Sequence, residues 1–129
     1  MEKRTYCLFL VDDNFINLEV GKSVLSDKYS VLTIPSGEKL FSVMKKTRPD
    51  MILLDIEMPG MSGFDVIKDL KAAPETKDIP VIFLTANTDP VNEGMGRSLG
   101  AVDFILKPYN PQYLLDKIEL YFRTQKTAS

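Results

Sequence analysis

The chain has 129 residues, 44% of them hydrophobic and 26% charged, with a formal net charge of −2. This length and composition predict one globular domain, residues 1–129, rather than a disordered or fibrous chain. The near-neutral balance, without a run of like charges, argues against direct binding of nucleic acid. The longest apolar stretch, residues 6–11, is too short for a membrane helix or a signal-peptide core, so we expect a cytoplasmic protein without membrane contact.

The chain contains no histidine and one cysteine, Cys7. The lack of histidine excludes histidine-based acid–base catalysis, a histidine nucleophile and the usual zinc sites. A single cysteine excludes a disulfide within the chain. Its position inside an apolar run predicts a buried core thiol.

Short apolar runs predict the strands of this domain. They span residues 6–11, 29–34, 51–54, 81–84 and 102–106. Runs without polar alternation are typical of strands that are covered on both faces, as in a parallel sheet. Helical periodicity between the runs implies right-handed crossovers. We therefore predict five strands alternating with five helices in a doubly wound, three-layer α/β fold, with its core over residues 6–122.

Apolar stripes predict the first two helices. Ile16, Val20 and Val24 recur every fourth residue and predict the buried side of a helix. The second stripe follows Ser36-Gly37 and consists of Leu40, Val43 and Met44. Each helix is expected to bury one side against the sheet.

Capping signals predict where the third and fourth helices begin. Ser62 followed by Asp65 resembles a capping box, and the helix that it opens has Phe64, Ile67 and Leu70 as its stripe. Asp89-Pro90 places a capping residue before a proline and opens the fourth helix. This helix contains Gly94 and Gly96, each about 1 kcal/mol less favourable than alanine, and it ends at Gly100. It is predicted to be the weakest of the five.

Asn110-Pro111 opens the last helix with the same capping chemistry. Its apolar stripe consists of Leu115, Ile118 and Phe122. The polar residues 123–129 are expected to form a frayed end or a cut linker.

Polar residues follow four of the apolar runs directly. They are Asp12-Asp13, Asp55, Thr85 and Lys107. In an open parallel sheet, ligands bind beyond the carboxyl ends of the strands, so we expect these side chains to converge at one edge. Three carboxylates that meet there imply a hard divalent cation such as Mg²⁺, which keeps coordination positions for phosphate oxygens. A lysine and a hydroxyl would neutralise a transferring phosphoryl group.

Asp55 is the candidate nucleophile, because a carboxylate can form an aspartyl phosphate. It interrupts the apolar run 51–56, where an ionised carboxylate costs stability unless it is paired or functional. Each residue alone also has a structural interpretation. Asp12-Asp13 could cap a helix, Thr85 could simply end a strand, and Lys107 could be a solvated surface lysine.

Together, four segments resemble the receiver domain of bacterial response regulators, related to the chemotaxis response regulator. The segments are residues 10–14 (LVDDN), 53–63 (LLDIEMPGMSG), 84–86 (LTA) and 100–108 (GAVDFILKP). The resemblance runs from about residue 6 to residue 122. It implies the flavodoxin-like strand order 2-1-3-4-5, for which the chemotaxis regulator is a standard example.

The resemblance implies a role for each residue of the site. Asp55 would be the phospho-acceptor, and Asp12, Asp13 and Asp55 would bind Mg²⁺ with the backbone carbonyl of Glu57, with Mn²⁺ expected to substitute. Lys107 would contact the phosphoryl group and Thr85 would move toward it. Phe104 matches the aromatic switch position of the family, although a plain core aromatic remains an equal interpretation.

Two further features follow from the resemblance. The peptide bond between Lys107 and Pro108 would be cis. Glu57 and Asn87, two positions beyond the acceptor and the threonine, would tune the lifetime of the phosphoryl group. The sequence does not decide whether Glu57 orders an attacking water or repels the donor.

The predicted function is phosphorylation-dependent switching in two-component signal transduction. The partner would be a sensor histidine kinase or a histidine phosphotransfer protein, and the output would be an effector domain or a homodimer formed through the fourth helix, fifth strand and fifth helix. The domain would catalyse its own phosphorylation and dephosphorylation without being a multiple-turnover metabolic enzyme. Two alternatives are a pseudo-receiver that only binds proteins and an aspartyl-phosphate phosphohydrolase. The phosphohydrolase would normally have a second acid two residues after the nucleophile followed by a threonine, and the segment Asp55-Ile56-Glu57-Met58-Pro59 breaks that pattern.

Overall fold

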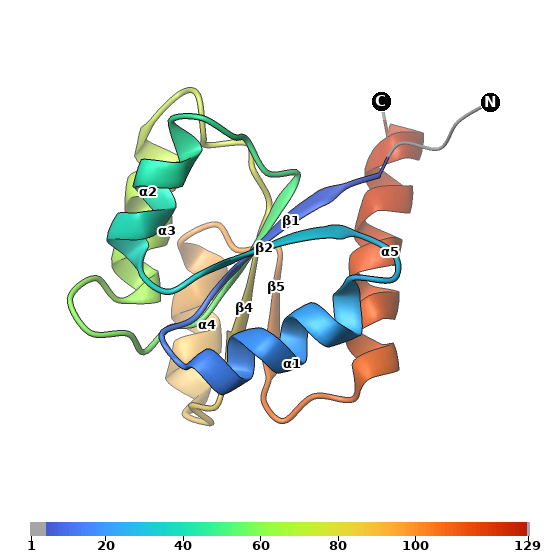
Figure 1. The fold of residues 1–129 in the computed structure, drawn as a ribbon. Coiled ribbons are helices and arrows are strands. Elements are labelled where there is room, and N and C mark those ends of the chain that lie inside the picture. The colour runs from blue at the N-terminus through green and yellow to red at the C-terminus, as the bar shows by residue number, and fades with distance from the viewer. Residues whose placement is uncertain (1–4, 129) are drawn as a thin grey trace.

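The chain folds into a parallel five-stranded sheet between two layers of helices (Figure 1). The computed structural model describes residues 5–128. The strand order is β2-β1-β3-β4-β5, which confirms the order that the family resemblance implied. The strands are β1 (Cys7–Val11), β2 (Ser30–Ile34), β3 (Met51–Leu54), β4 (Val81–Thr85) and β5 (Asp103–Leu106). The helices are α1 (Phe15–Leu25), α2 (Gly37–Met44), α3 (Gly63–Ala72), α4 (Pro90–Ser98) and α5 (Pro111–Ala128).

The two faces of the sheet carry separate apolar cores. Helices α2, α3 and α4 lie on one face, whereas α1 and α5 lie on the other (Figure 1). Alternate strand residues divide between the faces, so that Phe9 and Phe83 belong to the first core and Leu8 and Leu84 to the second. Strands β3 and β4 are buried along their whole length, as predicted from their uninterrupted apolar runs.

The edge strand β2 departs from that prediction. Its residues alternate between more and less exposed positions, and Leu32 is 40% exposed. An edge strand pairs on one side only, and β2 pairs with β1 alone among the described strands. The prediction that every strand is covered on both faces is therefore wrong at this edge.

The predicted helix starts are confirmed by their capping hydrogen bonds. Ser62 Oγ accepts from the Asp65 amide, and the Asp65 carboxylate accepts from the Ser62 amide, which completes the capping box of α3. Asp89 and Asn110 accept from amides in the first turns of α4 and α5. Gly100 follows α4 with a φ of 109°, a backbone conformation that side chains disfavour.

The stripe predicted for α1 is wrong. Ile16 is 69% and Val20 52% exposed, and the helix instead buries Leu18, Gly21 and Leu25. In a helix of 3.6 residues per turn, residues spaced strictly by four move gradually around the helix. Residues on one face are instead spaced alternately by three and by four. Val20 and Val24 instead line a cavity beside the carboxyl edge of the sheet.

Three smaller expectations also need correction. The buried stripe of α5 contains Leu114 rather than Leu115, together with Ile118 and Phe122. Residues 123–128, expected as a tail, continue α5, and Ser129 lies outside the described residues. The Cys7 thiol is half-buried rather than fully buried. No helix within residues 5–128 is long and apolar enough to cross a membrane.

Candidate phosphoryl-acceptor site

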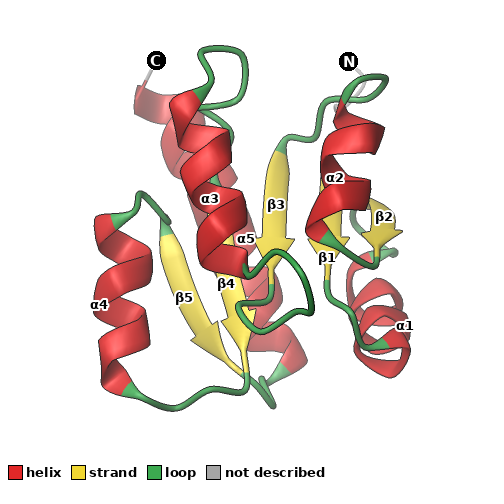
Figure 2. Cartoon of the chain, turned by 90° about the vertical axis from the view of Figure 1, so that its left-hand side faces the viewer, coloured by secondary structure: helices red, strands yellow, loops and turns green. Residues whose placement is uncertain are grey.

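The predicted site residues meet at the carboxyl edge of the sheet, to which all the strand arrows point (Figure 2). Carboxylate oxygens of Asp12, Asp13 and Asp55 lie within 4.8 Å of one another. Lys107 Nζ lies 2.5 Å from Asp12 Oδ2 and 3.8 Å from Asp55 Oδ2. Residues from three strand ends, far apart in the sequence, therefore form one cluster.

The backbone fixes Asp55 at the centre of this cluster. Its amide donates to the carbonyl of Val11 at 3.0 Å, which continues the pairing of β3 with β1 beyond the last strand residue. Its carboxylate Oδ1 accepts from the Ile56 amide at 2.8 Å. Asp55 is 9% exposed, so this hydrogen bond orients a carboxylate that has little contact with water.

The electrostatics of the site disfavour an ionised Asp55. Burial raises the pKa of the Asp55 carboxyl above its ordinary value, and the negative charge of Asp12 raises it further. Lys107 lowers this pKa, as do hydrogen bonds from the Ile56 amide and the Thr85 hydroxyl, but the net shift is upward. Additional positive charge beside Asp55 would therefore be stabilising.

The residues fit a hard divalent cation. Three carboxylates supply the anionic oxygen ligands that Mg²⁺ prefers, and Lys107 is an ammonium partner of both buried acids, Asp12 and Asp55. Receiver domains bind Mg²⁺ at an acidic pocket, and in this chain Asp12, Asp13 and Asp55 form an acidic cluster. Asp13 is exposed, so the cluster is open to solvent on one side.

Thr85 ends β4 and lies beside Asp55, and Asn87 follows two residues later. The Thr85 side chain is fully buried, and its hydroxyl accepts from the Asn87 amide at 3.2 Å. The Asn87 side chain in turn accepts from the amide of Asp89, the capping residue of α4. Hydrogen bonds thus link Asp55 through Thr85 and Asn87 to the start of α4.

Two further residues were predicted for the site, and the structure buries one of them, Phe104, and exposes the other, Glu57. Phe104 is 9% exposed, and its ring centroid lies 6.1 Å from that of Phe83, so in this structure it is a core aromatic. Its proposed inward movement remains a prediction. Glu57 is exposed and follows Asp55 by two residues.

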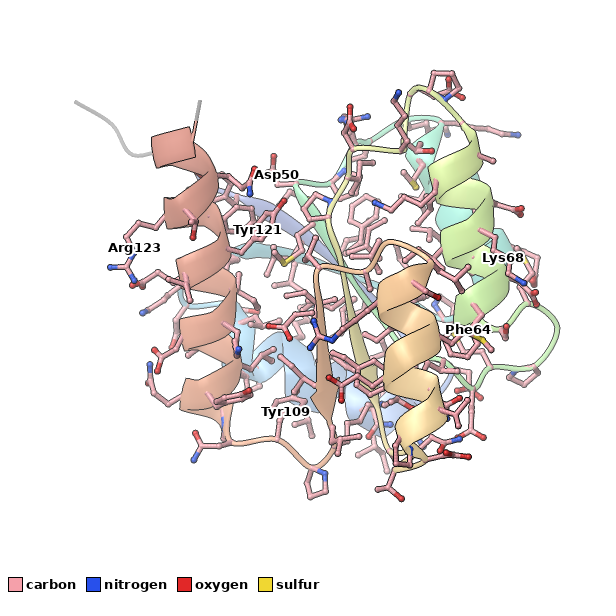
Figure 3. The ribbon with its side chains drawn as sticks, turned by 180° about the vertical axis from the view of Figure 1, so that it is seen from behind. Asp50, Phe64, Lys68, Tyr109, Tyr121 and Arg123 are labelled. Carbon is pink, nitrogen blue, oxygen red and sulfur yellow. The ribbon has the colours of Figure 1, made fainter. Side chains whose placement is uncertain are left out.

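Lys107 is placed by the backbone at the end of β5. Its amide donates to the Thr85 carbonyl at 2.8 Å, and the peptide bond to Pro108 is cis, the isomer that the family resemblance implied. Tyr109 follows in the loop before α5 (Figure 3). Asp12 and Lys107 also line a cavity of about 370 Å³, together with Val20, Val24, Tyr109 and Pro111 among others.

The structure also decides between the interpretations left open for single residues. Asn14, and not Asp12 or Asp13, caps α1 by accepting from the Asn17 amide at 3.0 Å. Asp12 is 3% exposed and contacts Lys107, so neither residue is a solvated surface charge. Sequence patterns did not single out Tyr109, although an aromatic directly after Lys107-Pro108 is a signal for it.

Comparison with known proteins agrees with this geometry. The response regulator receiver domain family matches residues 8–119 of the chain. The solved structure of the chemotaxis protein CheY4 of Vibrio cholerae is 30% identical, covers 90% of this chain and 98% of that one, and has a TM-score of 0.84. The receiver domain of a signal transduction histidine kinase from Syntrophus aciditrophicus is 31% identical over 89% of this chain and 88% of that one, with a TM-score of 0.82.

Curated relatives are longer than this chain. A protein of Vibrio cholerae named "Probable cyclic di-GMP phosphodiesterase" is 34% identical over 98% of the chain, which spans 29% of that protein. The DNA-binding response regulator MtrA of Mycobacterium leprae is 33% identical over 90% of the chain, which spans 51% of it. The match therefore covers one domain within proteins of different outputs.

Proposed function

This chain belongs to the response regulator receiver domain family, and on that premise we propose that Asp55 accepts a phosphoryl group from a phosphohistidine. The donor is a sensor histidine kinase or a histidine phosphotransfer protein, because receiver domains interact with these classes of protein. The phosphorylated domain then signals through a change in its surface.

One observation carries this proposal. Asp55 is a buried carboxylate with two further carboxylates within 4.8 Å and an ammonium 3.8 Å away. A structural role for three converging acids is costly, because burial and mutual repulsion raise the pKa of Asp55. The same arrangement is useful when a dianionic phosphoryl group and a divalent cation must bind together.

Asp12, Asp13 and Asp55 would hold Mg²⁺ together with the backbone carbonyl of Glu57, and Mn²⁺ would substitute. The cation would supply charge neutralisation for the transferring phosphoryl group. Asp12 pairs with Lys107 at 2.5 Å in this structure, so ligation by Asp12 would weaken that pair and leave Lys107 free to approach the phosphoryl oxygens.

In the transfer, an oxygen of Asp55 attacks phosphorus as the bond from phosphorus to the donor imidazole nitrogen breaks. The electron pair of that bond leaves with the imidazole. The Ile56 amide keeps the carboxylate oriented, and Lys107 neutralises charge on the phosphoryl oxygens. Catalysis is therefore mostly positioning and charge neutralisation.

The switch would run through Thr85 and Phe104 to α4. Charge on the phosphorylated Asp55 draws the Thr85 hydroxyl away from the Asn87 amide, which it contacts at 3.2 Å. Loss of that contact would loosen the chain of hydrogen bonds from Thr85 through Asn87 to Asp89. Movement of Phe104 against Phe83 would pass the change to the surface.

We place the output surface on α4, β5 and α5. A groove of about 340 Å³ there is lined by Glu93, Phe104, Leu106 and Tyr113, among others. Val91 is 65%, Leu106 46% and Tyr113 49% exposed, which provides apolar contact area for an effector domain or a second copy of this chain.

Neither alternative function is favoured. A pseudo-receiver would be expected to lack an acid or the lysine, whereas Asp12, Asp13, Asp55 and Lys107 all converge. The phosphohydrolase pattern is absent from the residues that follow Asp55.

The test is uptake of one phosphoryl group from acetyl phosphate, measured by intact mass with and without Mg²⁺. The wild type is expected to gain the group only with Mg²⁺, and Asp55→Asn is expected not to gain it. Asp69→Asn makes the same change on the exposed side of α3 and serves as the matched control. Uptake by Asp55→Asn, or equal uptake without the metal, would refute the proposal.

A further inference from the structure

Gly63, the first residue of α3, packs directly against the backbone of the acceptor. A Cβ atom at this position would overlap the carbonyl oxygen of Asp55. It would also lie 2.8 Å from the Ile56 Cα atom and 3.0 Å from the Asp55 carbonyl carbon. These are backbone atoms of one peptide, so no side-chain rotation can relieve the overlap.

This same peptide orients the acceptor carboxylate. Its N–H, from Ile56, donates to Asp55 Oδ1 at 2.8 Å, while its carbonyl oxygen faces Gly63. The next carbonyl, that of Ile56, accepts from the Gly63 amide at 2.7 Å. A displacement of the peptide at Gly63 would therefore move the donor that holds the carboxylate.

The first turn of α3 is not free to retreat from this contact. Ser62 and Asp65 close the capping box with hydrogen bonds of 3.1 and 3.2 Å. Val66 and Ile67, in the same turn and the next, are fully buried in the core. The clash would thus fall on the peptide between Asp55 and Ile56.

We infer that Gly63 is a positioning residue for phosphoryl acceptance: its missing side chain lets α3 press on the peptide whose N–H aims the Asp55 carboxylate. This inference rests on the proposed function of Asp55. A displacement near 1 Å at a reacting group lowers rates by up to about 100-fold. We expect Gly63→Ala to slow phosphoryl uptake about 10- to 100-fold while the domain remains folded.

The matched control is Gly94→Ala, the same substitution within α4. A Cβ atom at Gly94 would have no neighbour within 4 Å. The experiment measures the rate of phosphoryl uptake from acetyl phosphate at saturating Mg²⁺, well below the unfolding midpoint of each variant. A second readout is the Ile56 amide proton signal in NMR spectra of the metal-free proteins, which reports the hydrogen bond to Asp55 without any phosphorylation.

The inference is supported if Gly63→Ala is slow and shifts the Ile56 signal while Gly94→Ala behaves like the wild type. It is overturned if the two variants take up phosphate at the same rate, or if the Ile56 signal is unchanged. Failure of the wild type to take up phosphate would instead refute the role of Asp55, and the NMR comparison would still decide whether Gly63 positions its carboxylate.

If Gly63→Ala does not fold, Ser62→Ala decides the question. This variant removes one of the hydrogen bonds that hold the first turn of α3 against the Asp55–Ile56 peptide, and it adds no atom. Slower uptake with a shifted Ile56 signal supports the inference. Unchanged uptake by a folded Ser62→Ala protein overturns it.

Discussion

Helices α3 and α4 cover the same face of the sheet but are attached to it differently (Figure 2). Helix α3 buries Gly63, Val66, Ile67 and Leu70 and begins with a complete capping box. Among its nine described residues, α4 buries Gly96 alone. The helix that contacts the backbone of Asp55 therefore buries more side chains than the helix at the proposed output surface.

An ion pair joins α4 to β5, and the β5 carboxylate that it uses is shared with α5. Arg97 contacts Asp103 of β5 at 3.2 Å, and Lys117 of α5 reaches the same carboxylate at 3.4 Å. Arg97 is about half exposed, and ion pairs of this kind contribute about 0.2–1 kcal/mol each. A receiver needs a rigid acceptor and a mobile output, and this contrast in packing meets both needs.

The largest expected effect comes from Phe83, which packs between the two regions. It is fully buried, with its ring edge-on to Phe64 of α3 and tilted against Phe104 of β5. We expect Phe83→Ala to lower the free energy of unfolding by about 3–5 kcal/mol, because it removes a large side chain and leaves a cavity. Urea denaturation measures this. A loss below about 1 kcal/mol would contradict the packing described for β4.

The next effect concerns the charge of the acceptor. Because the pKa of Asp55 is raised in the folded state above the ordinary 3.8, its ionisation opposes folding at neutral pH. Asp55→Asn, which stays neutral, is expected to unfold at a higher temperature than the wild type at pH 7 without Mg²⁺.

The gain should shrink as the pH falls through the raised pKa and vanish below 3.8, where Asp55 is protonated in both states. Thermal denaturation of both proteins from pH 7 to pH 3.5, in a buffer with a chelator, makes the comparison. If the difference in unfolding temperature between Asp55→Asn and the wild type instead grows as the pH falls, the pKa of Asp55 is not raised in the folded state.

A smaller effect separates the two glycines of α4. Gly94→Ala is expected to raise the free energy of unfolding by up to about 1 kcal/mol, since alanine favours the helix and meets no neighbour there. Gly96→Ala has the same intrinsic advantage, but its Cβ atom would lie 3.0 Å from the Phe83 ring. It should gain less or lose stability. Equal gains in urea denaturation would show that α4 is packed as loosely at Gly96 as at Gly94.

The smallest effect is that of the ion pairs. Arg97→Gln should lower stability by about 0.2–1 kcal/mol at low ionic strength and by less in 1 M salt. Hydrogen exchange should also show less protection in α4 than in α3. Equal protection in all five helices would contradict the view of α4 as the mobile element.

Much of the fold was predictable because local signals agreed with one another. The run 51–54 and the capping pair Ser62 and Asp65 predicted β3 and the start of α3 correctly. The stripe at Ile16, Val20 and Val24 failed, because periodicity identifies an apolar side of a helix but not which side meets the sheet. The neighbours of α1 determine that choice.

The sequence alone determined which side chains form the site, since acids, a threonine and a lysine at the ends of apolar runs meet at one edge of a parallel sheet. Tertiary structure decided how that chemistry is held. The folded chain places Lys107 closer to Asp12 than to Asp55. It also packs Gly63 against the peptide whose N–H donates to the Asp55 carboxylate. These contacts join residues that are distant in sequence, and their distances depend on how whole helices pack.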